Sequence, residues 1–172
     1  EFVGGETARS DQSGCFLALD YTSFEGAFTE VIFREVLLRV YRHFLVEDAA
    51  STIIEVMSGT NRCRGRHVHY NVPATRMSGD MSTSCGNTFM NLILAHVIHR
   101  KATGSFHGLR GVFEGDDGLM SGPGDFDWDG LDMSEYGFIL KCEVHNSLNT
   151  AGFCQLKWSG TTLCRARDPL PV

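Results

Sequence analysis

The stretch Gly115-Asp116-Asp117-Gly118 decides the fold, because it lies between two short apolar segments at residues 111–114 and 118–120. Apolar segments joined by a short polar turn with glycine are typical of a β-hairpin. Such a turn presents adjacent carboxylates, and like charges this close are unfavourable unless a cation neutralises them. Mg²⁺ suits the task, since it prefers carboxylate and phosphate oxygens. A plain polar turn explains the same four residues, so the stretch alone does not specify a metal site.

Outward from this turn, strand and helix patterns are mixed along the chain. An apolar stripe formed by Phe33, Leu37, Val40, Tyr41 and Phe44 predicts a helix within residues 24–45. Residues 83–101 are apolar nearly all round, which is typical of a buried helix. Further strands are predicted at residues 15–19, 65–71, 138–142, 153–158 and 161–164. The mixture predicts an α+β fold, with an antiparallel sheet packed on helices, rather than a doubly wound sheet.

A second acidic stretch follows the first predicted strand. Asp20 ends that strand, where a carboxylate is costly unless it faces a cleft or an ion. Glu25 comes five residues later, so the two carboxylates can serve one site only if the chain bends between them. Ser23 is where a bend and a helix cap would fall. A helix entry with acidic residues near its positive end is the alternative, which explains Glu25 better than Asp20.

A third stretch is a loop rich in serine and glycine that leads into the buried helix. Thr83 and Asn87 are four residues apart, so both project from one helix face. A hydroxyl and an amide placed in this way can bind a ribose hydroxyl. Gly79 and Gly86 permit the close approach of a ligand or of another backbone segment. An N-terminal capping box is the alternative, but it does not account for two polar side chains on an apolar helix.

Composition sets limits on the function. With 172 residues, 42% of them hydrophobic, the chain can form one domain with a core. The net charge of −6 argues against a free-standing nucleic-acid binder, which normally has a basic face. Six cysteines without a C-x-x-C pair predict reduced thiols. No apolar run is long enough to span a membrane.

The order of these stretches resembles motifs A, B and C of the RNA-dependent RNA polymerases of positive-strand RNA viruses. The matching patterns are Asp-x4-acid, then S-G-x3-T-x3-N, then G-D-D. Residues 136–141 resemble motif D, and Phe153-Cys154-Gln155 resembles the motif E strand. Residues 76–81 and 153–155 look most like tombus-like and noda-like polymerases. The resemblance covers nearly all of residues 15–158.

The resemblance implies a right-hand polymerase palm with part of the fingers. Residues 1–172 would be a single palm fragment with a fingers insertion around residues 46–77, and the upstream fingers and downstream thumb would be missing. The implied reaction is template-directed nucleotidyl transfer to an RNA 3′ end by two Mg²⁺ or Mn²⁺ ions. The implied metal site comprises Asp20, the Tyr21 carbonyl, Asp116 and Asp117. The implied ribose-binding residues are Glu25, Ser78, Gly79, Thr83 and Asn87.

Glu25 and Lys141 each have a second interpretation within that resemblance. Glu25 stands where most of the family has Asp, so its carboxylate is displaced by one C–C bond. Lys141 is the implied general acid that protonates pyrophosphate, and a solvated surface lysine is the alternative for this residue.

The implied partners are an RNA template, the nascent RNA strand, ribonucleoside triphosphates, and the remaining fingers and thumb of the same polyprotein or replicase. Those missing parts would carry most of the lysines and arginines that hold RNA, which accounts for the acidic charge. The implied location is the host cell cytoplasm, at membrane-associated replication complexes. Two alternatives stay open: a reverse transcriptase, which shares the palm, and a non-catalytic RNA-binding palm remnant. The Thr83/Asn87 pair and the G-D-D turn favour an RNA product.

Overall fold

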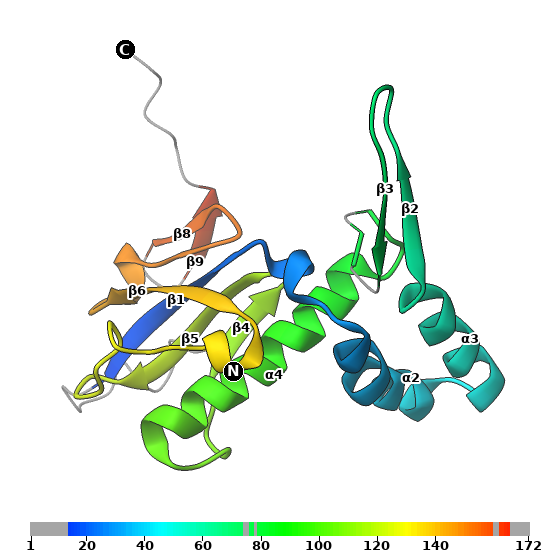
Figure 1. Ribbon diagram of the computed structural model, residues 1–172. Helices are drawn as coiled ribbons and strands as arrows, with labels where there is room; N and C mark the ends of the chain where they lie inside the picture. The colour runs from blue at the N-terminus through cyan, green and yellow to red at the C-terminus, as the bar shows by residue number, and fades with distance from the viewer. Residues whose placement is uncertain (1–13, 74–75, 78, 160–161, 166–172) are drawn as a thin grey trace. The chain divides into compact units, whose positions relative to one another are not determined.

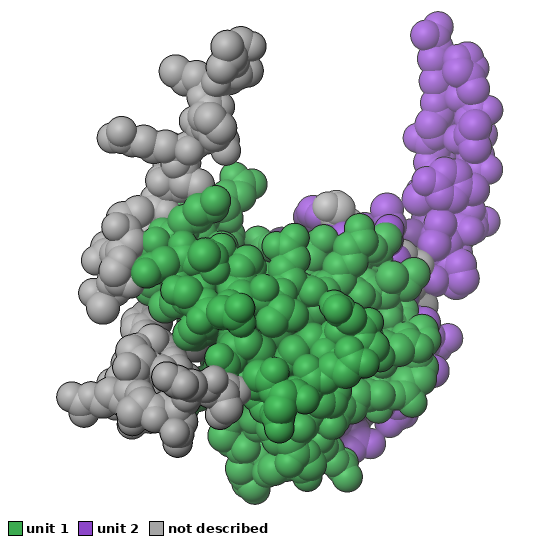
Figure 2. All heavy atoms as spheres, turned by 90° about the vertical axis from the view of Figure 1, so that its left-hand side faces the viewer, with its two compact units in different colours: residues 1–22, 87–172 green, residues 23–86 purple. Residues whose placement is uncertain are grey.

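The computed structural model describes residues 14–73, 76–77, 79–159 and 162–165 (Figure 1). The chain divides into two compact units, one made of residues 1–22 and 87–172 and the other of residues 23–86 (Figure 2). Helices and strands are mixed as predicted, and every strand pairing in the described ranges is antiparallel.

A four-stranded antiparallel sheet dominates the unit of residues 1–22 and 87–172. Its strand order is β4 (Gly111–Glu114), β5 (Asp117–Pro123), β1 (Gly14–Thr22) and β6 (Ile139–His145). In β1, Cys15, Leu17, Leu19 and Tyr21 are buried and the residues between them are more exposed. This period-two alternation is what a strand with one core face requires.

Helix α4 (Thr83–Thr103) begins in the other unit and packs against this sheet from residue 87 onward (Figure 1). Met90, Leu94, Ala95 and Ile98 are buried along it, at the spacing of one helix face. A Cβ added to Gly118 would lie 3.2 Å from both Leu19 Cδ1 and Asn91 Nδ2. The Leu19 face of the sheet is therefore the one that α4 covers.

The C-terminal part of the same unit contains a three-stranded sheet of β7 (Gly152–Phe153), β8 (Leu156–Ser159) and β9 (Thr162–Arg165). The single strand predicted for residues 153–158 is wrong, because Cys154 and Gln155 form a two-residue turn with φ of 49° and 60°. Positive φ at both central residues is the mark of a type I′ hairpin, which usually needs glycine or asparagine. Short η3 (Ser134–Tyr136) and η4 (Leu148–Thr150) flank β6.

The unit of residues 23–86 is built from helices and one hairpin. Its elements are η1 (Phe24–Ala27), the π-helix η2 (Ile32–Leu37), α2 (Leu38–Phe44), α3 (Glu47–Met57), β2 (Thr60–Arg64) and β3 (His69–Pro73). Phe24, Phe28, Phe33, Leu37 and Ile54 are buried in it. The strand predicted for residues 65–71 begins only at His69, because residues 65–68 form the hairpin loop, closed by a bond from Gly65 N to Val68 O.

The continuous stripe predicted within residues 24–45 is also wrong in its second half. Phe33 and Leu37 are buried, but Phe44 is 75% exposed. The π-helical turn η2 explains the difference, because its wider turn shifts the phase of every later residue away from a 3.6-residue period. The bend predicted at Ser23 is present, with φ of 54°, but its side chain caps no backbone group.

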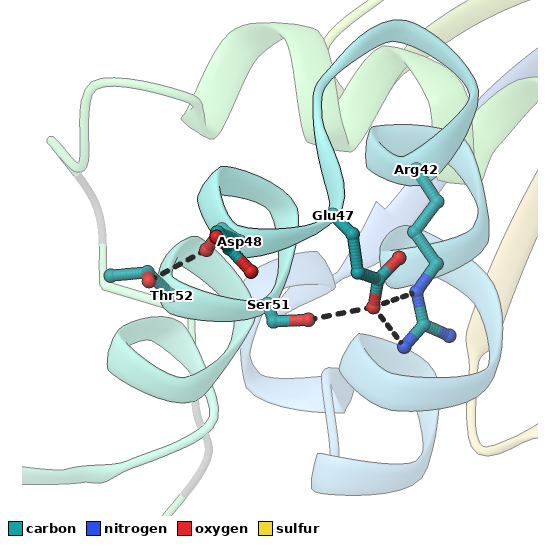
Figure 3. A network of polar contacts seen from close by, with 5 residues as sticks. All are labelled: Arg42, Glu47, Asp48, Ser51 and Thr52. Atoms are coloured by element: carbon teal, nitrogen blue, oxygen red, sulfur yellow. Dashed lines mark hydrogen bonds and ion pairs between the residues drawn. The ribbon is translucent and has the colours of Figure 1, made fainter.

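A polar network fixes the connection between α2 and α3 (Figure 3). Arg42 donates to Glu47 Oε1 from Nε at 2.8 Å, and the Ser51 hydroxyl donates to the same oxygen at 2.9 Å. Arg42 is the first cause of a lowered pKa at Glu47, followed by Ser51. These groups are exposed, so the network orients the chain more than it stabilises it.

The four described ranges contain no helix of the length and hydropathy that crossing a membrane requires.

Candidate active site

The acidic turn joins β4 to β5. Glu114 pairs with Asp117, so Gly115 and Asp116 form a two-residue hairpin loop. Gly115 has φ of 62°, and glycine with positive φ at the first central position is typical of a type II′ turn. Asp116 is therefore at the tip, whereas Asp117 is the first residue of β5. Both carboxylates are exposed.

Strand register places three of the predicted site residues on one sheet face. Leu19 pairs with Gly118 in the antiparallel register of β1 and β5. One residue further along β1, Asp20 therefore lies opposite Asp117, the residue before Gly118. Asp20 also pairs with Lys141 of β6. Residues directly opposite on neighbouring strands project from the same face. Because Leu19 and Gly118 face α4, the side chains of Asp20, Asp117 and Lys141 are on the opposite face.

The environment of Asp117 disfavours its charged form. Partial burial raises the pKa of this carboxyl, and the carboxylates of Asp116, Asp20 and Glu114 raise it further. A hydrogen bond with Cys154 acts in the other direction. Sequence reasoning missed Glu114, although its position opposite Asp117 follows once the turn is known to have two residues.

The Cys154 thiol lies at the edge of this acidic group. It donates to Glu114 Oε2 at 3.6 Å, from the I′ turn between β7 and β8. Burial raises its pKa to about 12, with further contributions from the charges of Asp117 and Glu114. At neutral pH the thiol is therefore protonated and serves as a hydrogen-bond donor to the carboxylates.

The loop that precedes α4, in the unit of residues 23–86, is organised around Arg76. This side chain is 2% exposed, and its guanidinium carbon lies 4.7 Å from the Phe28 ring centroid and 5.4 Å from that of Phe33. Nη1 donates to the Ser82 carbonyl at 3.3 Å. Nε and Nη2 are buried without a hydrogen-bond partner among the described residues. A Cβ on Gly86 would lie 2.5 Å from Nη2.

Charges near Arg76 moderate the cost of its burial. Burial lowers the pKa of the guanidinium, and Tyr41, Asp80 and Glu25 oppose that shift. The Asp80 carboxylate also accepts from Met77 N at 3.3 Å. The loop backbone is thus folded over a cation that is partly compensated by two carboxylates.

The predicted ribose-binding residues are distributed over both units. Glu25, Gly79 and Thr83 belong to residues 23–86, Asn87 belongs to the other unit, and Ser78 lies outside the described residues. The Thr83 hydroxyl donates to Met77 O at 3.2 Å and keeps its lone pairs for a further donor. Asn87 follows Thr83 by one turn of α4 and is 3% exposed.

Tyr21, whose carbonyl was predicted as a metal ligand, pairs with Leu140 in the β1–β6 ladder. Its side chain is buried, with the ring edge-on to Phe138 at 6.2 Å between centroids.

The donor chemistry fits Mg²⁺ or Mn²⁺. Asp20, Asp116 and Asp117 offer hard carboxylate oxygens, and their mutual repulsion at Asp117 is what a divalent cation would relieve. Within the described ranges, no three His, Cys, Asp or Glu side chains converge closely enough to hold a metal by themselves. Mg²⁺ is commonly held by one or two carboxylates together with substrate phosphates and water, so it does not need such a group.

Comparison with known proteins assigns the chain to a class. Residues 39–158, more than half of the chain, match the model of a family described as viral RNA-dependent RNA polymerase. The chain therefore belongs to the viral RNA-dependent RNA polymerase family. The matched segment contains the acidic turn, α4 and Lys141, whereas Asp20 and Glu25 precede it. A comparison with curated proteins gives no significant match.

Membership in this family implies RNA-dependent RNA synthesis from ribonucleoside triphosphates during viral replication, and the family generally uses divalent metal ions.

Proposed function

We propose that this chain forms the palm and part of the fingers of a right-hand polymerase, and that it adds ribonucleotides to an RNA 3′ end under the direction of a template. The observation that carries the proposal is the placement of Asp20 beside Asp117 on neighbouring strands, with Asp116 at the adjoining turn. The tombus-like and noda-like lineage is the part of the family that residues 76–81 and 153–155 favour.

In this proposal Asp20 and Asp116 hold two Mg²⁺ or Mn²⁺ ions, Asp117 supports them, and the Tyr21 carbonyl is a further oxygen ligand. When bound, these ions lower the pKa of the attacking 3′-hydroxyl and neutralise the leaving pyrophosphate. The chain itself supplies a fixed arrangement of carboxylates on one sheet face. The raised pKa of Asp117 supports the assignment, because partial burial and the nearby carboxylates of Asp116, Asp20 and Glu114 all disfavour its charged form, which a bound cation would favour.

Lys141 is proposed as the general acid that protonates pyrophosphate. Lys141 pairs with Asp20, so its side chain projects from the same sheet face as those of Asp20 and Asp117, and the residue is exposed. An amine at this position can donate a proton to a leaving oxygen.

Ribose selection is proposed for Glu25, Ser78, Gly79, Thr83 and Asn87. Thr83 supports the assignment, because its hydroxyl is fixed by Met77 and still accepts a hydrogen bond. Gly79 supports it through a φ of 95°, which leaves the backbone open to a ligand.

We assign residues 46–77 to a fingers insertion, with further fingers and the thumb supplied by other parts of the same polyprotein or replicase. The proposed partners are the template, the nascent RNA strand and ribonucleoside triphosphates. The proposed place of action is the host cytoplasm, at membrane-associated replication complexes.

Primer extension on an RNA template tests the proposal, with the full-length protein that contains this segment. The comparison is between wild type and Asp116→Asn, in Mg²⁺ and in EDTA, with ribo- and deoxyribonucleotides. We expect Mg²⁺-dependent ribonucleotide incorporation that falls on the order of 10³-fold in the variant, since a metal ligand is worth several kcal/mol. Asp125→Asn, in an exposed loop, is the matched control and should retain activity.

The outcomes separate the candidate functions. Retained activity in Asp116→Asn would contradict the assignment of this turn. Incorporation of deoxyribonucleotides alone would indicate a reverse transcriptase. Tight RNA binding without any incorporation would indicate a non-catalytic palm remnant.

A further inference from the structure

Two polar side chains of α4, Thr88 and Asn91, contact the backbone of the acidic turn. Asn91 is fully buried, and its Nδ2 lies 3.3 Å from the Gly115 carbonyl oxygen and 3.0 Å from those of Asp116 and Asp117. The Thr88 hydroxyl accepts from Gly115 N at 2.7 Å. One amide with two protons is thus shared by three successive carbonyls, and a neighbouring hydroxyl holds the main-chain N–H of the turn.

This arrangement fixes the direction of the turn. Three carbonyl oxygens pointing at one place repel each other unless a donor lies between them, which is the role that Asn91 Nδ2 fills. A Cβ on Gly118 would point toward Asn91, on the side of the sheet that α4 covers. The side chain of Asp117, one residue earlier on β5, therefore points to the opposite face of the sheet. With its carbonyls held on the side of α4, the turn keeps the Asp117 carboxylate on the side of Asp20.

Both glycines of the G-D-D-G stretch fit this contact. Gly115 supplies the positive φ of 62° that the turn requires. Gly118 leaves room for the amide, since a Cβ there would lie 3.2 Å from Asn91 Nδ2, closer than ordinary packing. The sequence thus specifies both the turn and the space beneath it.

We propose that Thr88 and Asn91 are positioning residues for the catalytic turn, which hold the carboxylates of Asp116 and Asp117 in the geometry that binds divalent cations. The inference rests on the proposed function and extends it to two residues that do not touch substrate. The Asn91 amide donates and the Thr88 hydroxyl accepts, and both groups are uncharged, so they fix the turn without neutralising it. A lysine in the same place would also hold the carbonyls, but its charge would compete with the metal ions.

Conservative substitutions test the proposal in the full-length protein. Thr88→Val removes the hydroxyl and keeps the shape, whereas Thr88→Ser keeps the hydroxyl. Asn91→Leu removes the amide at similar volume. Thr103→Val is the matched control on the same helix, fifteen residues from Thr88 or about 22 Å along the axis, where the hydroxyl bonds His99 O.

Three measurements are made on each variant. The Mg²⁺ concentration for half-maximal primer extension and the KM for nucleotide are obtained from kinetics. Binding of Mn²⁺ alone, without RNA or nucleotide, is followed by the loss of the free Mn²⁺ electron paramagnetic resonance signal. The melting temperature in EDTA reports stability.

We expect Thr88→Val and Asn91→Leu to require more Mg²⁺ and to bind Mn²⁺ roughly 10- to 100-fold more weakly, as is usual when groups that orient metal ligands are removed. Nucleotide KM should change little, and Thr88→Ser and Thr103→Val should behave like wild type.

A purely structural role gives a different result. If both variants melt at lower temperature but keep wild-type Mg²⁺ dependence and Mn²⁺ affinity, the proposal is overturned. If Thr88→Ser is as impaired as Thr88→Val, the hydroxyl is not the relevant group and the proposal is likewise overturned. A wild-type protein that incorporates no nucleotide would refute the proposed function, and Mn²⁺ binding would then decide the role of Thr88 and Asn91 separately.

Discussion

The acidic turn and the loop that precedes α4 are both held by polar side chains, but of opposite kinds. The turn of residues 115–117 is fixed by an uncharged amide and a hydroxyl, which leave its carboxylates uncompensated. The loop that begins at Arg76 is folded over a buried cation, which Glu25 and Asp80 partly neutralise. The first region is arranged to accept positive charge from outside, whereas the second holds its own cation, which is partly balanced by carboxylates of the same unit.

This difference indicates how each region responds to change. A neutral hydrogen-bonding group can be removed without leaving a buried charge, so loss of the Asn91 donor or the Thr88 acceptor should affect the turn locally. Displacement of Arg76 moves a buried cation away from its rings and its carbonyl partner, so it should affect the stability of the unit of residues 23–86.

The largest effect on stability is expected from Gly86→Ala. The added Cβ would lie 2.5 Å from Arg76 Nη2, so the buried guanidinium must shift from its position over the Phe28 and Phe33 rings. We expect a loss of about 1–3 kcal/mol in the free energy of unfolding, although alanine by itself favours a helix by about 1 kcal/mol. Urea denaturation measures the change. Discrimination between ribo- and deoxyribonucleotides should weaken, and the Mg²⁺ dependence should not move.

Gly26→Ala is the control for that experiment, since its Cβ would meet only Ser23 Cβ at an ordinary 3.7 Å. Equal stability of the Gly86→Ala and Gly26→Ala variants would show that the Arg76 side chain moves aside without a loss of folding free energy. The buried cation would then not determine the stability of the unit of residues 23–86, in contradiction to the comparison above.

An intermediate effect is expected from Gly118→Ala, compared with Gly115→Ala. At Gly118 the new Cβ presses on the Asn91 amide, whereas at Gly115 it meets nothing and only the positive φ is strained. Both substitutions should cost about 1 kcal/mol in stability. The Mg²⁺ requirement of primer extension should rise more in Gly118→Ala, because only that variant moves the donor. An equal rise in both variants would mean that turn strain, rather than the amide contact, controls metal binding.

The smallest effect is expected from Asp117→Asn, measured by thermal unfolding in EDTA. The raised pKa of Asp117 means that the folded state binds a proton more readily than the unfolded chain, so stability falls as pH rises from the ordinary Asp value to the raised one. Above that window the variant should melt slightly higher than wild type, and the difference should vanish well below the ordinary Asp pKa, where the carboxyl is protonated in both the folded and the unfolded chain.

Addition of Mg²⁺ should reverse the order of Asp117→Asn and wild type, because the ion stabilises only the protein that binds it. Identical melting curves at all pH values would show that solvent already screens the repulsion around Asp117.

The sequence was a good guide where local pattern and tertiary environment agree. Strand β1, helix α4 and the hairpin of β4 and β5 follow from apolar periodicity and from the glycines of the turn. The π-helical turn η2 could not be predicted, because no residue in it forbids an ordinary α-helix. The I′ turn at Cys154 and Gln155 has no glycine to mark it, and its strain of about 1 kcal/mol per residue must be offset by contacts such as that of Cys154 with Glu114.

For the candidate site, the sequence pointed to the residues with reactive groups but not to the residues that position them. Asp20, Asp117 and Lys141 come together through strand register, and their catalytic roles stay predictions. Thr88 and Asn91 escaped notice because a polar residue on a buried helix has no distinctive spacing until its partner is known. Glu25, Ser78, Gly79, Thr83 and Asn87 stay predictions for ribose binding.

One consequence concerns where the chain tolerates changes in length. Helix α4 is held to the turn at Asn91, and His99 Nε2 lies 3.0 Å from the His107 carbonyl oxygen near the other end. An inserted residue between these two anchors would rotate one against the other by about 100°, so related chains should show no insertions or deletions there. The exposed loop at residues 65–68 has no such constraint. It is the place where a peptide tag or a label can be introduced with the least disturbance.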